Sequence, residues 1–185
     1  MERMLALTVI EQSRDQELVR KAREGSHAAF DVLFQRHKQF IYNVCYSMLG
    51  SADDAVDATQ AAFIQAYRAI RRFREEAAFR SWLYRIAVNV CTRMLKRERR
   101  RSLLMLRSES PAADAASGDR VWEAVQALSL DSRAVLVLFY FQGLTCSEIA
   151  EALGCSEAAV RTRLHRARVA FKKEYEETVN ELRGW

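Results

Sequence analysis

The sequence predicts an all-α protein built from two small helical domains joined by a flexible linker. Its 185 residues include one proline and six glycines, whereas a many-stranded fold needs turn residues about every ten positions. Half of the residues are hydrophobic, and they recur at three-to-four spacing, the period of one helix face. This hydrophobic content also excludes wholesale disorder.

We expect the first domain over residues 15–101, after a mobile arm at 1–14. Helix caps divide this domain into separate helices. A first helix is expected from Asp15 to Glu24, and it ends at Gly25. Ser26 then caps a long helix that ends at Gly50. Ser51 caps the next helix, whose buried stripe is predicted to comprise Ala55, Thr59, Ala62, Phe63, Ala66, Tyr67 and Ile70.

The third long helix is predicted to have two functional faces, and the region around it is strongly basic. Residues 68–101 contain twelve basic and three acidic residues, a local net charge of +9. One face is apolar, and the other carries Trp82, Arg85, Asn89, Arg93 and Lys96. Aromatic stacking combined with cationic contacts to phosphate is typical of single-stranded nucleic-acid binding. The alternative is that Trp82 packs at the edge of the core while the cations are simply solvated.

Residues 102–119 are predicted to be the linker, because their serine, alanine, proline and glycine content breaks the helical pattern. The second domain then covers 120–185. Its first helix is expected to end near Leu128, with Asp131 as the next cap.

A helix-turn-helix is the sharpest local feature of this second domain. Thr145 and Glu148 form a capping box that opens a short helix. Gly154 ends that helix, and Ser156 caps the one that follows.

In a helix-turn-helix the second helix enters the major groove of duplex DNA. The candidate DNA contacts on it are Arg161, Thr162, Arg163, His165, Arg166 and Arg168. Arginine binds guanine with two hydrogen bonds, and such a pair discriminates by about 1–3 kcal/mol. The alternative is a basic surface helix in an ordinary helical bundle.

No residue pattern predicts catalysis, a metal site or a cofactor. The four cysteines lack a paired spacing and the three histidines do not complete a zinc motif. His27 and His37 are interpreted as solvated surface residues, and Cys45 and Cys91 as buried packing residues. Without a signal peptide or membrane-length apolar run, the chain is expected in the cytoplasm.

Two pairs of segments resemble the sigma-70 family in its extracytoplasmic-function (group 4) form. Residues 54–67 (DAVDATQAAFIQAY) and 79–89 (FRSWLYRIAVN) are similar to sigma domain 2. Residues 148–154 (EIAEALG) and 160–168 (VRTRLHRAR) are similar to sigma domain 4. The resemblance implies a specificity subunit of bacterial RNA polymerase with no chemistry of its own.

The resemblance also implies partners for particular residues. The helix with Asp54, Asp57, Gln60 and Phe63 would dock on the clamp of the polymerase beta-prime subunit, and the beta subunit would be a further partner. The loop beginning at Phe73 and the face with Asn89 would open the minus-10 promoter element and capture a flipped base. The candidate contacts on the second helix of the helix-turn-helix would read the minus-35 element.

Three further interpretations concern control and competing functions. An anti-sigma factor would hold such a protein inactive by covering its polymerase-binding surfaces. A helix-turn-helix regulator that never binds polymerase is the main rival, but it leaves the first domain without a role. A scaffold that binds only proteins is the second rival, and it leaves the aligned cations without one.

Overall fold

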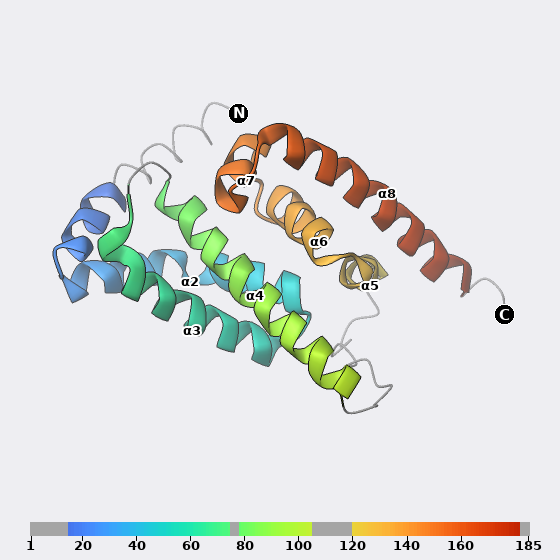
Figure 1. The fold of residues 1–185 in the computed structure, drawn as a ribbon, viewed down its shortest axis with the longest axis horizontal. Coiled ribbons are helices and arrows are strands. Elements are labelled where there is room, and N and C mark those ends of the chain that lie inside the picture. Colours follow the sequence, from blue (N-terminus) through green and yellow to red (C-terminus); the bar gives the residue numbers. More distant parts are fainter. Residues whose placement is uncertain (1–14, 75–77, 105–119, 182–185) are drawn as a thin grey trace.

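A computed structural model describes residues 15–74, 78–104 and 120–181. Every regular element in those ranges is helical, which confirms the predicted all-α fold (Figure 1). The predicted arm, residues 1–14, lies outside the described residues. So does most of the predicted linker, although its first residues, 102–104, continue the preceding helix.

The helices follow one another with short connections. A first helix spans residues 15–23. After it come α2 (His27–Leu49), α3 (Ala52–Ala69), the 3-10 turn η1 (Ile70–Arg72), α4 (Phe79–Leu104), α5 (Arg120–Ala127), α6 (Leu130–Leu136), the π-helical turn η2 (Val137–Phe141), α7 (Cys146–Leu153) and α8 (Glu157–Glu181).

Most predicted caps are present. The Ser26 and Ser51 hydroxyls accept from the backbone N–H groups of residues 29 and 54, and Gly50 ends α2 with φ 80°. The prediction of Asp131 as a cap is wrong. Ser129 caps α6 by accepting from the Ser132 N–H, and Asp131 lies in the first turn, where a carboxylate favours the positive end of the helix dipole.

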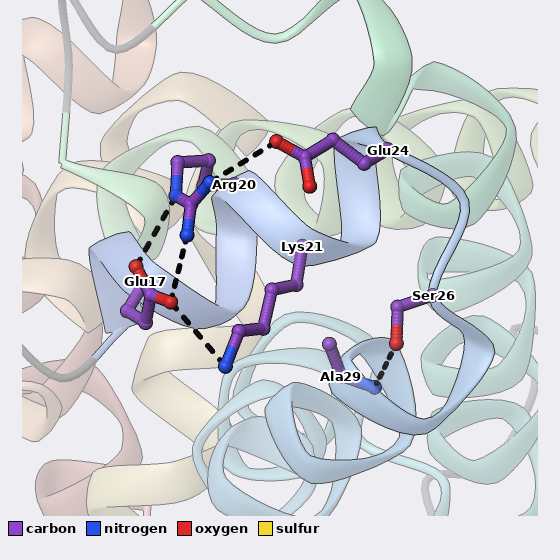
Figure 2. A network of polar contacts seen from close by, with 6 residues as sticks. All are labelled: Glu17, Arg20, Lys21, Glu24, Ser26 and Ala29. Carbon is purple, nitrogen blue, oxygen red and sulfur yellow. Dashed lines mark hydrogen bonds and ion pairs between the residues drawn. The ribbon is translucent and has the colours of Figure 1, made fainter.

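The first helix joins α2 at a sharp turn that Ser26 helps to fix. Three ion pairs along its exposed side link Glu17 to Arg20 and Lys21, and Arg20 to Glu24 (Figure 2). Exposed pairs of this kind contribute only a few tenths of a kcal/mol each. The helix is instead held by its buried face, where Val19 is 1% exposed.

A buried polar contact also holds the first helix to α2, and it overturns the interpretation of His37 as a solvated residue. His37 is 8% exposed, and its Nε2 lies 2.7 Å from an Asp15 carboxylate oxygen. Arg36 donates to the other oxygen at 3.0 Å. Burial alone would raise the pKa of Asp15, but its hydrogen bonds and charge interactions with His37 and Arg36 bring the pKa below its ordinary value.

Helices α2, α3 and α4 pack around one apolar core, and α5 to α8 pack onto them as a second unit. Residues 15–104 are called the N-terminal unit and residues 120–181 the C-terminal unit. Leu138, Ile149 and Val160 of the C-terminal unit belong to the same buried cluster as Leu33 and Leu83 of the N-terminal unit. The units are therefore in direct apolar contact, with α7 against α4 (Figure 1).

Cys45 and Cys91 are both fully buried, which confirms that they serve as packing residues. Their thiols face each other across α2 and α4. The hydrogen bond to Cys45 and burial together raise the pKa of the Cys91 thiol, so this thiol stays protonated. A protonated, buried thiol is a poor nucleophile.

We predict that Asp15→Asn lowers the free energy of unfolding at pH 7 by about 1.5–3 kcal/mol, because it weakens two hydrogen bonds to a charged acceptor. A carboxyl with a depressed folded-state pKa stabilises the fold above its unfolded pKa, near the ordinary 3.8. That contribution disappears as pH falls. Urea unfolding at pH 7 and pH 3 measures both effects.

Asp31→Asn, at an exposed acid on α2, is the matched control and should change stability little. Equal unfolding free energies for wild type and Asp15→Asn at pH 7 would contradict the assignment of the buried contact.

Candidate nucleic-acid interface

An open pocket of about 360 Å³ lies between α3 and α4, on the face predicted to bind single-stranded nucleic acid. It is lined by Gln65, Ile86, Asn89, Thr92, Arg93 and Lys96. Three residues of the predicted stripe therefore come together here: Asn89, Arg93 and Lys96. All three are exposed.

Arg93 is fixed at the rim of this pocket by two hydrogen bonds. Its Nη2 donates to Gln65 Oε1 at 2.8 Å, and its Nε donates to the Asn89 carbonyl at 3.2 Å. The pocket thus combines an apolar wall from Ile86, two side-chain amides and two cations. Amides can bond to the edge of a planar base while cations neutralise a phosphate.

The sequence pattern missed Gln65, because it lies on α3 rather than α4. Residues 64 and 66 flank it on the exposed and buried sides of α3, so helical spacing alone gives it no special status. Only the packing of α3 against α4 brings its amide to Arg93.

The other predicted minus-10 residues lie apart from the pocket, toward the start of α4. Phe73 is 5% exposed, and its ring centroid is 4.7 Å from that of Trp82. Trp82 is half-buried and packs against the core, in agreement with the alternative considered for it. Arg85 is half-buried, so the predicted stripe is divided between the pocket and an aromatic cluster.

The exposed face of α3 carries acids, an amide and apolar side chains. Asp54, Asp57 and Gln60 are exposed. Phe63 is 4% exposed and packs edge-on against Phe34, with ring centroids 4.7 Å apart. Phe63 therefore lies beneath the exposed face and packs α3 against α2.

Two exposed apolar residues on α3 were missed by the sequence analysis, and a third was placed wrongly. Val56 and Ile64 are 45% and 50% exposed. Tyr67, predicted to be buried, is 43% exposed, and its hydroxyl is 2.7 Å from Nδ1 of His27. Large apolar groups gathered with acids on one helix face indicate a protein contact.

The predicted helix-turn-helix is present. The Thr145–Glu148 capping box is complete and Gly154 ends α7 with φ 64°. Ser156 accepts from the Ala159 N–H at the start of α8. Buried Val160 and Leu164 fix the rotation of α8, which leaves Arg161, Thr162, His165, Arg166 and Arg168 exposed and Arg163 half-buried.

These side chains differ in how firmly they are held. Arg161 pairs with Glu157 at 2.6 Å, and Thr162 donates to the Ala158 carbonyl. Arg163 lies 3.9 Å from the Cys155 sulfur, and Arg168 donates to the Tyr140 hydroxyl at 2.8 Å. Within the described part of the chain, His165 and Arg166 have no polar partner and are available to a ligand.

An exposed aromatic surface lies on the C-terminal unit. Tyr140 and Phe141 in η2 are 55% and 46% exposed. The Arg168 guanidinium lies over the rings of Phe139 and Tyr140. A π-helical turn shifts the register of its side chains, and here it keeps two adjacent aromatics outside the core.

The residues described contain no cluster of three His, Cys, Asp or Glu side chains that could hold a metal ion. In the same residues, no helix combines the length and apolar content needed to cross a bilayer.

Comparison with known proteins decides the family. Residues 33–101 match the model for sigma-70 region 2, and residues 118–171 match that for sigma-70 region 4. RNA polymerase sigma-H factor of Pseudomonas aeruginosa is 32% identical over 94% of this chain and 100% of its own length. The chain belongs to the sigma-70 family. Relatives such as the sigma-E factor of Escherichia coli K12, 32% identical over 87% of this chain and 94% of the relative, place it among the extracytoplasmic-function sigma factors.

Solved structures agree with this sigma-factor fold. CnrH, in complex with the cytosolic domain of CnrY, aligns with a TM-score of 0.69 at 31% identity, over 88% of this sigma factor and 97% of CnrH. RpoE of Bartonella quintana, crystallised with the anti-sigma factor NepR, shares the fold with a TM-score of 0.62 at 22% identity, over 80% and 96% of the two chains.

Proposed function

We propose that this sigma factor binds core RNA polymerase, recognises the minus-10 and minus-35 promoter elements and promotes DNA opening. Residues 15–101 would act as sigma domain 2 and residues 120–185 as sigma domain 4, with 102–119 as the connection. The pocket between α3 and α4 carries the proposal. A solvated helix face needs no pocket in which two amides and two cations meet beside an apolar wall.

Core polymerase would bind at the exposed face of α3. Asp54, Asp57 and Gln60 provide charge and hydrogen bonding, and Val56 and Ile64 provide apolar contact. Buried Phe63 would fix the rotation of the helix. This combination suits the beta-prime clamp, because acids would steer the encounter with a cationic surface while the apolar groups hold the contact. Tyr140 and Phe141 would provide the corresponding contact with the beta subunit.

Promoter DNA would bind at two places. A base from the opened minus-10 element would enter the pocket beside Asn89, with Arg93 and Lys96 against the flanking phosphates. Duplex DNA of the minus-35 element would lie along the exposed side of α8, where Arg166 and His165 read base edges.

Regulation would come from an anti-sigma factor that covers the polymerase-binding surfaces. Support comes from a protein of the same fold, RpoE of Bartonella quintana, which is crystallised in complex with the anti-sigma factor NepR. The rival function, a helix-turn-helix regulator without polymerase, gives no role to the α3 face or to the pocket.

Alanine at both Asp57 and Gln60 is expected to weaken binding to core RNA polymerase by tenfold or more, because both side chains lie in the proposed contact. Fluorescence anisotropy with the labelled full chain measures the affinity. Glu176→Ala combined with Glu177→Ala, two exposed acids on α8, is the control. Unchanged affinity for the α3 variant would remove this face from the proposed interface.

Asn89→Ala is expected to slow promoter opening roughly tenfold while core polymerase affinity stays unchanged. The reason is that the side-chain amide of Asn89 would bond only to the base extruded from the minus-10 strand. Fluorescence of a base analogue in the minus-10 strand follows opening. Asn43→Ala, an exposed asparagine on α2, is the control. Equal loss of opening and polymerase binding would show that this face of α4 serves the polymerase instead.

Arg166→Ala is expected to weaken binding of holoenzyme to upstream duplex DNA. It should also reduce the slope of log affinity against log salt by about one, because one cationic contact is lost. A salt titration of binding to a fork-junction promoter measures the slope. Unchanged affinity together with an unchanged slope would mean that Arg166 does not contact the DNA.

A further inference from the structure

The pocket between α3 and α4 offers a ligand many hydrogen-bond donors and few acceptors. None of its lining residues is acidic; they are Gln65, Ile86, Asn89, Thr92, Arg93 and Lys96. Arginine and lysine side chains only donate, whereas amides and hydroxyls both donate and accept. Side-chain acceptors on this lining are therefore confined to the two amides and the Thr92 hydroxyl. A base that presents acceptors of its own is favoured there.

The two amides of the pocket differ in how freely they can turn. Within the described part of the chain, the Asn89 side chain has no hydrogen-bond partner, and the residue is exposed. Its amide can therefore present either the carbonyl or the NH2 group to a ligand. An amide of this kind bonds to a donor or to an acceptor on a base, so Asn89 alone discriminates poorly between the two.

Gln65, by contrast, is held in one orientation. Its Oε1 accepts from Arg93 Nη2 at 2.8 Å, and a guanidinium has no acceptor to which the amide nitrogen could bond instead. Arg93 is itself fixed, because its Nε donates to the Asn89 carbonyl at 3.2 Å. The helix under Gln65 is anchored as well, since the next residue, Ala66, is fully buried. The NH2 group of Gln65 is thus the part of the amide left for a ligand, and it only donates.

Nucleobases differ in the exocyclic group that a fixed donor would meet. Guanine and thymine carry a carbonyl oxygen where adenine and cytosine carry an amino group. An NH2 group that cannot turn bonds to the carbonyl oxygen. Against an amino group it places donor on donor, which leaves both desolvated groups unpaired.

We infer that Gln65, locked by Arg93, makes the pocket select a base with an exocyclic carbonyl, guanine or thymine, over adenine and cytosine. This inference rests on the proposed function, in which an unpaired minus-10 base enters the pocket, and it names the class of base. The lock uses two of the five guanidinium N–H groups. The other three stay available to a flanking phosphate, so Arg93 can hold the strand and fix Gln65 at the same time.

Uracil and cytosine test the inference, because they differ only in this exocyclic group and in the proton on the adjacent ring nitrogen. The full-length chain should bind labelled oligodeoxyuridine about fivefold more tightly than oligodeoxycytidine of equal length. Fluorescence anisotropy at fixed salt and pH measures both affinities. Equal affinities, or no binding of either oligomer, would overturn the inference.

Gln65→Glu keeps the lock and reverses the group that faces the ligand, because one carboxylate oxygen accepts from Arg93 and the other replaces the NH2 group. The added negative charge should lower both affinities, but their ratio should invert in favour of cytosine, whose amino group donates. Gln35→Glu, at an exposed glutamine on α2, carries the same charge change outside the pocket and should leave the ratio unchanged. A ratio that Gln65→Glu does not change would overturn the inference.

Arg93→Met removes the lock, so the Gln65 amide can turn and the ratio of affinities should fall toward one. A ratio that stays at the wild-type value would also overturn the inference. Core polymerase affinity, measured on the same chain, tests the proposed function separately. A preference for uracil that Gln65→Glu inverts, in a chain that does not bind polymerase, would support the inference and overturn the proposed function.

Discussion

The packing of α4 is the constraint on which the rest of the molecule depends. This helix buries Leu83, Tyr84 and Ala87 against its neighbours, which fixes its rotation. The same rotation turns Asn89, Arg93 and Lys96 outward beside α3 and presents its N-terminal half to α7. One amphipathic helix therefore sets the core, the pocket and the contact between the two units. Core substitutions in α4 would disturb binding even without touching a ligand.

The helix boundaries and the helix-turn-helix could be predicted because their signals are local. Ser26, Thr145 and Gly154 act within four residues of their own positions, so neighbouring sequence is sufficient. The cap of α6 was assigned to Asp131 instead of Ser129, two residues too late, since serine and aspartate both cap helices well. His37, Tyr67 and Gln65 were misjudged or missed because their partners are 22, 40 and 28 positions away. Hydrophobic spacing specifies which side of a helix is buried, but it does not specify which helix covers it.

The candidate site residues divide in the same way, into those whose exposure could be predicted from the sequence and those whose burial could not. Exposure of Asp57, Gln60, Asn89 and Arg166 follows from helical period once the apolar face is known. The burial of Phe73 and Phe63 does not, because an aromatic residue at the edge of a stripe can either close the core or remain outside it. Here Phe73 packs with Trp82, and Phe63 packs with Phe34. Their effect on ligands would therefore be exerted through the position of α3 and α4.

The contact between the two units has a polar part that water can replace. Arg133 and Glu151 bond to backbone groups at helix ends, and water could satisfy these backbone groups if the units separated. The apolar part of the contact is different. Separation would expose Leu138 and Ile149, which are now fully buried. Another apolar surface would then have to bury these two side chains.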